Sequence, residues 1–244
     1  MIMKKEKDPM GAAIADYWKN GVAGRLRVFS PDFDEDEIPV STLFRDVDEM
    51  PVIEQEALRL ADGRILDVGA GAGCHAIALQ NMGKDVTAID ISPLSIDVIA
   101  ERGVRKFLLK DFFELNAEES GEFNTILFLM NGIGIAGSID TLPKFFEKIK
   151  NLLADDGCVL LDSSDIRYVF ENEDGSLDIN LDDNYYGELE YQMQYKRVKG
   201  DPFPWLYIDF ATLQGYAEDN GLKAELIAEG EHYDYLAKLT ITQI

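Results

Sequence analysis

A short apolar run that ends in a glycine-rich turn is the feature that most constrains this chain. Residues 65–79 read ILDVGAGAGCHAIAL, with Gly69, Gly71 and Gly73 at every second position. Because glycine has no Cβ, such a turn tolerates positive φ angles and lets a ligand lie directly on the backbone. The run before the turn predicts a buried strand and the residues after it predict a helix. A unit of this kind binds its ligand at the carboxyl end of the strand.

Beyond residue 51, short apolar runs alternate with segments of helical periodicity. We expect strands over residues 64–68, 86–89, 106–109, 123–130, 158–161, 223–228 and 235–241, and helices over 74–82, 93–103, 141–153 and 212–220. The last two strands are close enough in sequence to pair antiparallel. This alternation is typical of an α/β fold with a largely parallel sheet.

The size and charge of the chain exclude several classes of protein. With 244 residues it is long enough for one large domain, and its net charge of −23 disfavours a nucleic-acid substrate. No apolar run approaches the length of a membrane span, and two cysteines do not make a disulfide framework. We therefore expect a cytoplasmic protein without a membrane or nucleic-acid partner. The acidic clusters at residues 34–37 and 171–183 are interpreted as solvated loops, with a mouth that attracts a cationic substrate as the alternative.

The spacing of the glycines and one acid before them indicate which ligand lies on the turn. The pattern is G-x-G-x-G, and Cys74 stands where the dinucleotide fingerprint has its third glycine. Asp67, two residues before the first glycine, would repel a phosphate and attract an ammonium group. S-adenosylmethionine (SAM) carries an amine and an adenosine but no phosphate.

Two further strand ends fit the same ligand. Asp90 ends the second strand and can accept hydrogen bonds from both hydroxyls of a ribose, while Ile91 can pack on a flat base. Asp111 ends the third strand and can accept from an exocyclic amine such as that of adenine, and Phe112 can offer its backbone N–H to a ring nitrogen. The three acids in this order favour SAM as the cofactor.

These motifs resemble those of the class I SAM-dependent methyltransferases. The similar segments are LDVGAGAG at 66–73, AIDIS at 88–92, KDFF at 110–113, ILFLMNGIG at 126–134 and LLADDG at 152–157, and the resemblance covers roughly residues 55–165 and 209–244. It implies a doubly wound seven-stranded sheet of order 3-2-1-4-5-7-6 with the last strand antiparallel. It also implies a set of cofactor-binding residues: Asp67, Gly69, Ala70, Gly71, Gly73, Asp90, Ile91, Asp111, Phe112 and Asn131.

Two regions lie outside this pattern and are interpreted as covers for the site. Residues 1–50 are expected to form an N-terminal lid, followed by a SAM-binding domain over 51–244. Residues 185–208 alternate apolar and polar side chains and predict an antiparallel hairpin inserted after the fifth strand. We expect an aromatic acceptor pocket with Arg45 near the carboxylate of SAM, lined by Tyr17, Phe44, Tyr191, Tyr195, Trp205 and Tyr207. The alternative is that the hairpin packs on the sheet edge or against a second copy in a homodimer.

No catalytic constellation is evident. Transfer of an activated methyl group depends mainly on positioning, and a base is needed only where the acceptor is protonated. The candidates for such a role are Asn131, Asp162 and His75, although the position of His75 in the first turn of a helix favours a helix-packing or cofactor-adjacent role over base catalysis. No spacing of ligands predicts a metal site.

The resulting functional hypothesis is methyl transfer from SAM, which yields S-adenosylhomocysteine (SAH), to a small-molecule acceptor. A protein acceptor and a non-catalytic SAM-binding sensor or assembly protein are the alternatives. An NAD(P)-dependent dehydrogenase agrees less well with the glycine spacing and with Asp67.

Overall fold

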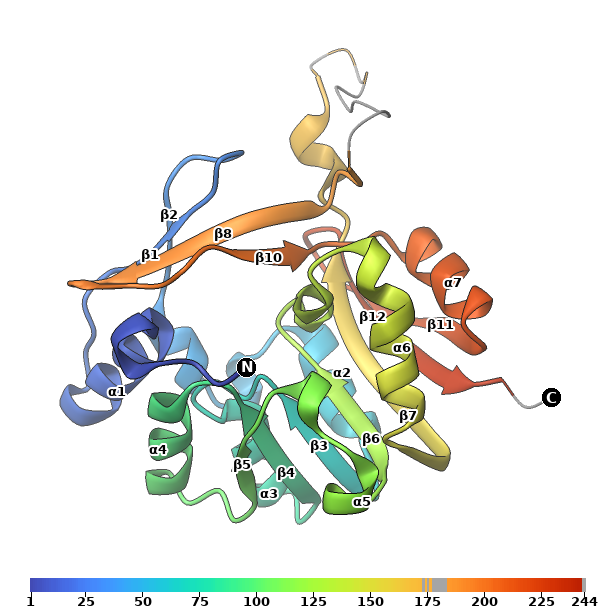
Figure 1. Cartoon of the computed structure of the whole chain (residues 1–244), viewed down its shortest axis with the longest axis horizontal. Coiled ribbons are helices and arrows are strands. Elements are labelled where there is room, and N and C mark those ends of the chain that lie inside the picture. The colour runs from blue at the N-terminus through green and yellow to red at the C-terminus, as the bar shows by residue number, and fades with distance from the viewer. Residues whose placement is uncertain (173, 175, 177–183, 243–244) are drawn as a thin grey trace.

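The computed structural model describes residues 1–172, 174, 176 and 184–242, and its centre is a seven-stranded sheet (Figure 1). The strand order is β5-β4-β3-β6-β7-β12-β11. Neighbours from β5 to β7 pair in parallel, whereas β12 is antiparallel to both β7 and β11. In chain order this is 3-2-1-4-5-7-6, so the predicted topology is confirmed. The bounds are Arg64–Val68 (β3), Asp85–Asp90 (β4), Phe107–Leu109 (β5), Phe123–Phe128 (β6), Leu153–Ser164 (β7), Leu222–Glu229 (β11) and Asp234–Ile241 (β12).

Helices cover both faces of this sheet because its strands are apolar on both sides. One face packs against α2 (Val52–Leu60), α3 (Cys74–Asn81) and α4 (Pro93–Glu101). The other packs against α6 (Leu142–Lys150) and α7 (Phe210–Asp219), where the buried side chains of α6 recur at helical spacing. A short helix, α5, spans Ala117–Ser120.

A second, antiparallel sheet lies across the carboxyl ends of the parallel strands (Figure 1). Its order is β10-β8-β1-β2, with β9 paired to β8. The strands are β1 (Leu26–Phe29), β2 (Asp36–Ile38), β8 (Glu188–Tyr195), β9 (Val198–Lys199) and β10 (Phe203–Leu206). The predicted hairpin is confirmed as the β8–β10 pair.

The N-terminal segment contributes β1 and β2 to this second sheet, which its weak periodicity did not predict. Strand β1 pairs with β8 across more than 160 residues of sequence, with Leu26 opposite Tyr195. Helix α1 (Pro9–Asn20) packs beside β8 and α4. The two expected covers are therefore a single unit. Short 3₁₀ turns complete the chain at Lys5–Lys7, Val40–Phe44, Val47–Glu49, Phe112–Glu114, Gly132–Ala136, Ile139–Thr141 and Ile166–Phe170.

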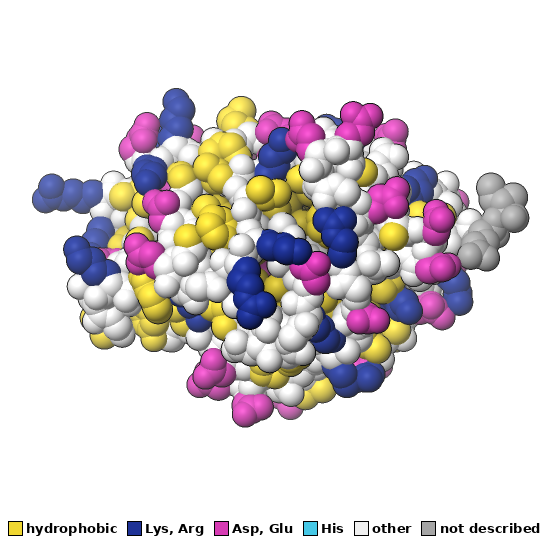
Figure 2. All heavy atoms as spheres, turned by 90° about the horizontal axis from the view of Figure 1, so that it is seen from below, with side chains coloured by type: hydrophobic (Ala, Val, Ile, Leu, Met, Phe, Trp, Pro, Cys, Tyr) yellow, Lys and Arg dark blue, Asp and Glu magenta, His cyan; other side chains and the backbone are white. Residues whose placement is uncertain are grey.

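The face of the molecule opposite to the second sheet has a mixed distribution of charge. There, acidic and basic side chains are interspersed (Figure 2). Residues 173, 175 and 177–183 of the acidic segment lie outside the described residues. Over the part of the chain that is described, no helix is long and apolar enough to cross a membrane.

Candidate active site

The glycine turn between β3 and α3 has the predicted left-handed conformation. The φ angles of Gly69, Gly71 and Gly73 are +72°, +56° and +83°. A Cβ on Gly71 would meet nothing closer than 4.0 Å, so its backbone is open to a ligand. A Cβ on Gly73 would instead lie 3.2 Å from the side chain of Ile99, so this glycine serves the packing of α3 against α4.

Asp67, the residue before the end of β3, has a carboxylate with one oxygen that lacks a hydrogen-bond partner in the described structure. The residue is only 2% exposed, and its Oδ2 atom has no hydrogen-bond partner within the described protein. Burial raises the pKa of Asp67, and the opposing influences are the nearby His75 and the backbone N–H of Ala76. A buried anion with a free oxygen at a cavity wall is suited to accept hydrogen bonds from an ammonium group.

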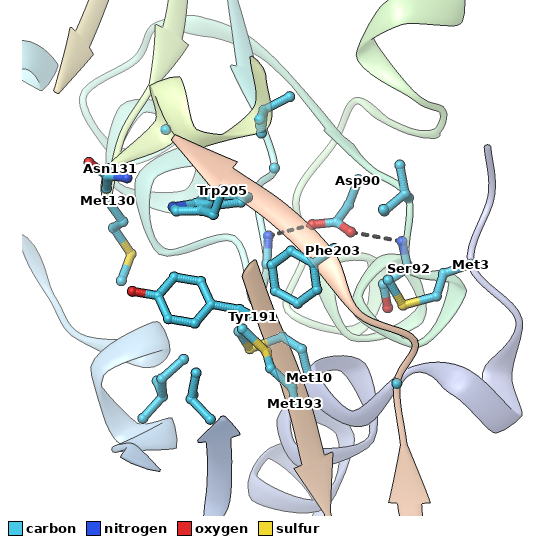
Figure 3. Close-up of a pocket in the computed structure, with 18 of the residues that line it drawn as sticks. Met3, Met10, Asp90, Ser92, Met130, Asn131, Tyr191, Met193, Phe203 and Trp205 are labelled. Atoms are coloured by element: carbon cyan, nitrogen blue, oxygen red, sulfur yellow. Dashed lines mark hydrogen bonds between the residues drawn. The ribbon is translucent and has the colours of Figure 1, made fainter. Parts of the chain in front are cut away.

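Asp90 ends β4 and lies against the same turn (Figure 3). Its carboxylate oxygens accept hydrogen bonds from the backbone N–H groups of Gly71 and Ser92, each at 2.8 Å. Burial raises the pKa of Asp90 to about 6. Each oxygen keeps further acceptor capacity, because a carboxylate offers about four lone-pair sites.

Asp111 and Phe112 follow β5 along the same edge of the sheet. The Asp111 carboxylate accepts from the backbone N–H of Phe113 at 2.9 Å and also pairs with the α-ammonium of Met1. The backbone oxygen of Ile91 accepts a hydrogen bond from the backbone N–H of Met3 at 2.9 Å. The first residues of the chain therefore run along the strand ends that were predicted to hold the adenosine.

These strand ends open into one large cavity of about 1440 Å³. Asp67, Asp90, Asp111 and the glycine turn line one part of it. The inner face of the second sheet lines another part, where Tyr191, Phe203 and Trp205 lie together (Figure 3). The cavity wall also includes Ala70, Ile91, Phe112, Asn131, His75 and Tyr207.

The turn after β6 also lines the cavity and has an unusual backbone. Met130 and Asn131 both have positive φ, at 64° and 55°, which is uncommon for residues other than glycine. The buried carboxylate of Asp162 on β7 accepts the backbone N–H groups of Met130 and Gly132 at 3.0 and 3.1 Å. Burial raises the pKa of Asp162 to about 7. Asp162 therefore supports this turn, and it does not line the large cavity.

The side-chain amide of Asn131 is also engaged within the protein. It donates to the backbone oxygen of Leu206 at 3.1 Å and accepts from the hydroxyl of Ser163 at 3.1 Å. Asn131 thus ties the β6 turn to β7 and to the end of β10.

His75 lies in the first turn of α3 and is 5% exposed. Its Nε2 atom is 2.7 Å from Glu54, which also pairs with Arg45. Although burial lowers the pKa of His75, Glu54 and Asp67 outweigh it, so that the net shift is upward. His75 is therefore held by its contact with Glu54.

Four residues expected in the acceptor pocket lie outside the cavity. The Arg45 guanidinium is buried against Glu54, so it does not point toward the cofactor. Tyr17 and Phe44 stack on each other with ring centroids 4.6 Å apart, in the small core between α1 and the second sheet. The Tyr195 hydroxyl donates to Asp16 at 2.6 Å and accepts from the backbone N–H of Gly24, which fastens the N-terminal segment to β8. Aromatic composition alone could not separate these core residues from Tyr191, Trp205 and Tyr207.

Sequence reasoning missed Asp8, which joins the N-terminal segment to the site. This fully buried carboxylate accepts from the backbone N–H of Gly11 at 2.8 Å and from the hydroxyl of Ser92 at 2.5 Å. Ser92 in turn donates its backbone N–H to Asp90. The Asp-Pro pair at positions 8 and 9 is a helix-start signal that could have located α1.

The residues of the site fit SAM. The free oxygen of Asp67 suits the ammonium group, the spare acceptor sites of Asp90 suit the ribose hydroxyls, and the open face of Gly71 leaves room for the ligand at the turn. With the confirmed sheet order, this arrangement defines a class I, Rossmann-like SAM-binding protein.

Comparison with known proteins agrees with this class. Residues 65–157 match the model of a methyltransferase domain. The crystal structure of a SAM-dependent methyltransferase from Bacteroides fragilis, in complex with SAH, is similar over 100% of this chain and 98% of that protein, with 57% identity and a TM-score of 0.93. The chain therefore belongs to the SAM-dependent methyltransferase family, and SAM is its cofactor.

The similarity to curated relatives is more local. A ubiquinone biosynthesis O-methyltransferase from Xanthomonas euvesicatoria is 36% identical over 74 residues, which are 28% of this chain and 31% of that enzyme. A ribosomal protein L11 methyltransferase from Symbiobacterium thermophilum is 29% identical over 96 residues, or 39% of this chain and 31% of that enzyme. The chain thus spans about a third of the length of these relatives.

Proposed function

We propose that this chain transfers the methyl group of SAM to a small-molecule acceptor. One observation carries the proposal: a single cavity joins the glycine turn and its acids to the apolar inner face of the second sheet. A reaction between two bound molecules needs such a shared space, with the reacting groups held together and water excluded.

The residues of the chain would divide the work by position. Asp67 would bind the ammonium group of the cofactor, Asp90 its ribose, and Asp111 with Phe112 its base. When bound, SAM supplies an electrophilic methyl group: the lone pair of the acceptor bonds to the methyl carbon while the carbon–sulfur bond breaks and its electrons remain on sulfur. The β6 turn, supported by Asp162, would hold the boundary between cofactor and acceptor.

A small acceptor fits better than a protein because the second sheet and the first residues of the chain both line the cavity. A peptide segment would need an open groove to reach the β6 turn. In this proposal the second sheet and residues 1–50 together act as the lid, and the remainder of residues 51–244 is the SAM-binding domain. The Tyr195 contacts with Asp16 and Gly24 favour a lid that acts as one piece.

Calorimetric titration with SAM and SAH tests the cofactor half of this proposal. We expect Asp90→Ala to weaken SAH binding at least tenfold, about 1.4 kcal/mol. Asp97→Ala is the matched control, because Asp97 is an exposed acid on α4 that pairs only with Lys5 in the described structure. Absence of binding to the intact chain would refute the proposal.

Mass spectrometry of a panel of small acceptors incubated with SAM and the intact chain tests the transfer itself. A product heavier by one methyl group would support the proposal. Tight SAH binding with no product from a broad panel would favour the non-catalytic alternative.

A further inference from the structure

We propose that the acceptor is a planar nitrogen heteroaromatic compound that is methylated on a ring nitrogen and leaves as a cation. This inference rests on the proposed function and names its substrate class. Three independent features of the acceptor end of the cavity carry it: its shape, its charge and the engagement of the groups that could act as bases.

The acceptor end is shaped for a flat ring. Trp205, Phe203 and Tyr191 follow one another on the inner face of β10 and β8, with ring centroids 6.0 Å apart for the first pair and 6.3 Å for the second (Figure 3). The Trp205 indole lies directly on the β6 turn, where a Cβ on Gly134 would overlap it. The Phe203 and Trp205 rings meet edge to face at 87°, and the Tyr191 and Phe203 rings are tilted by 51°, so a planar ligand can stack on the face of one ring and meet the edge of its neighbour.

Methionine side chains complete the wall. Met10, Met130 and Met193 all line the cavity around Tyr191 (Figure 3). Thioethers are polarisable and adapt their shape to a ligand without offering it a charge or a strong hydrogen bond. The acceptor end therefore selects mainly by planarity and apolar contact.

The charge of this end disfavours anionic acceptors. Among the described residues that line the cavity, the lysines are Lys4, Lys7 and Lys110, and no arginine is present. Lys7 lies beside the second sheet but is paired with Asp201 at 2.6 Å, whereas Lys110 follows the end of β5 near the predicted adenosine site. A carboxylate or phosphate at the inner face of the second sheet would thus have to compete with Asp201 for Lys7.

The same end carries carboxylates without cationic partners. Asp36 lies opposite Val28, which lies opposite Met193, so all three face the cavity side of the second sheet. Asp34 also lines this rim, and within the described part of the chain neither acid forms a salt bridge. Burial first, and then the neighbouring Tyr207 and Asp36, raise the pKa of Tyr191, so its phenol stays neutral.

Aromatic faces together with free carboxylates stabilise a cation. In the proposed step the ring nitrogen uses its lone pair to bond to the methyl carbon, the carbon–sulfur bond breaks with its electrons on sulfur, and the positive charge moves to the nitrogen ring. The charge thus develops in a cavity that is lined by Trp205 and Tyr191 and that carries Asp36 at its solvent-exposed rim.

Among the described residues, the candidate bases beside the β6 turn are all engaged within the protein, which favours nitrogen over a hydroxyl group as nucleophile. Asp162 accepts two backbone N–H groups, the Asn131 amide is bonded on both sides, and His75 is paired with Glu54. A ring nitrogen needs none of them because no proton has to leave. An alcohol or phenol would have to be deprotonated first.

The test compares three flat probes of similar size on the SAH-loaded chain: N-methylisoquinolinium, 2-naphthol and 2-naphthoate. Calorimetry gives the affinities, and fluorescence in a Trp18→Phe background reports Trp205 alone, since the chain has two tryptophans. We expect the cation to bind at least tenfold more tightly than the carboxylate and to change the Trp205 emission. Asp36→Asn should reduce this preference at least threefold.

Glu37→Gln is the matched control, because Glu37 neighbours Asp36 on β2 but pairs with Arg25 and does not line the cavity. With SAM, isoquinoline should gain one methyl group and 2-naphthol none. Equal or tighter binding of the carboxylate, binding of none of the probes, or methylation of the naphthol alone would overturn the inference. SAH binding is measured in the same samples. If the proposed function fails, SAH binding is lost, whereas it is retained if only this inference about the acceptor is wrong.

Discussion

Replacing Asp67 by asparagine should change stability and cofactor affinity in opposite directions. Asp67 is buried and keeps one oxygen without a partner, so the ligand-free protein bears the cost of an incompletely compensated charge. Asparagine has nearly the same shape and no charge. We expect Asp67→Asn to raise the free energy of unfolding of the ligand-free chain by about 1–3 kcal/mol near pH 8, because the substitution removes the buried charge and keeps the side-chain volume.

The same substitution removes the charge that should bind the ammonium group of SAM. Hydrogen bonds to charged groups contribute about 1.5–3 kcal/mol, so SAH affinity should fall roughly tenfold to a hundredfold. The gain in stability should itself depend on pH. Because burial raises the folded-state pKa of Asp67 above its unfolded value, the penalty is absent at low pH and complete once the pH exceeds the raised pKa.

Urea unfolding at pH 5 and pH 8 gives the stabilities, and calorimetry gives the SAH affinity at pH 8. Asp85→Asn is the control substitution, because Asp85 at the start of β4 is exposed and pairs with Lys106. The reasoning would be refuted if Asp67→Asn lost stability and affinity together, since Asp67 would then be a structural residue with all its partners inside the protein.

Three other substitutions test the supports of the site. The pKa of Asp162 is about 7 in the folded protein and about 3.9 in the unfolded chain, so stability should fall as the pH rises between these values. Urea unfolding should show that Asp162→Asn removes up to about 1.4 kcal/mol per pH unit of this slope. Parallel pH profiles of stability for the two proteins would contradict this. Gly134→Ala should displace the Trp205 indole and destabilise the protein by about 1–3 kcal/mol. Gly215→Ala, at an open position in α7, should stabilise it by about 0.5–1 kcal/mol. Thermal melts followed by tryptophan fluorescence would contradict this if the two variants had the same stability. Asp8→Ala should lower the free energy of unfolding by about 1–2 kcal/mol through loss of a helix cap, and it should speed hydrogen exchange in residues 1–12. Unchanged exchange in these residues would contradict the role of Asp8 in fastening the N-terminal segment.

The seven-stranded sheet was predictable from the sequence because the signals for its strands and helices are local. Apolar strands, caps such as Ser92 and the left-handed glycines at 69, 71 and 73 each act within a few residues, and the order of the strands follows from the family resemblance. The cofactor side of the site was predictable for the same reason, since strand ends meet at one edge of a parallel sheet. Gly73 is the exception, because its role in packing against Ile99 depends on a tertiary contact.

The second sheet and the acceptor end were only partly predictable because their contacts are long-range. The pairing of β1 with β8 has no local signature, since β1 has only four residues and β2 three. The amphipathic alternation of β8 showed that it covers something, but not that Tyr195 would face the α1 core while Tyr191 faces the cavity. Likewise, the close approach of Trp205 explains Gly134 only once both are placed in space.

The pairing of β1 with β8 also has a consequence for how the protein acquires its shape during synthesis. The N-terminal segment emerges from the ribosome first, but its partner strand follows only after the whole parallel sheet through β7 has been made. Contacts of such long sequence separation form late because of their large loop-closure entropy. We therefore expect the Rossmann-like body to fold first, with Leu26 and its neighbours exposed until β8 is released. A nascent chain stopped before residue 188 should be sensitive to proteases over residues 26–38, which form β1 and β2, and resistant within its completed parallel strands.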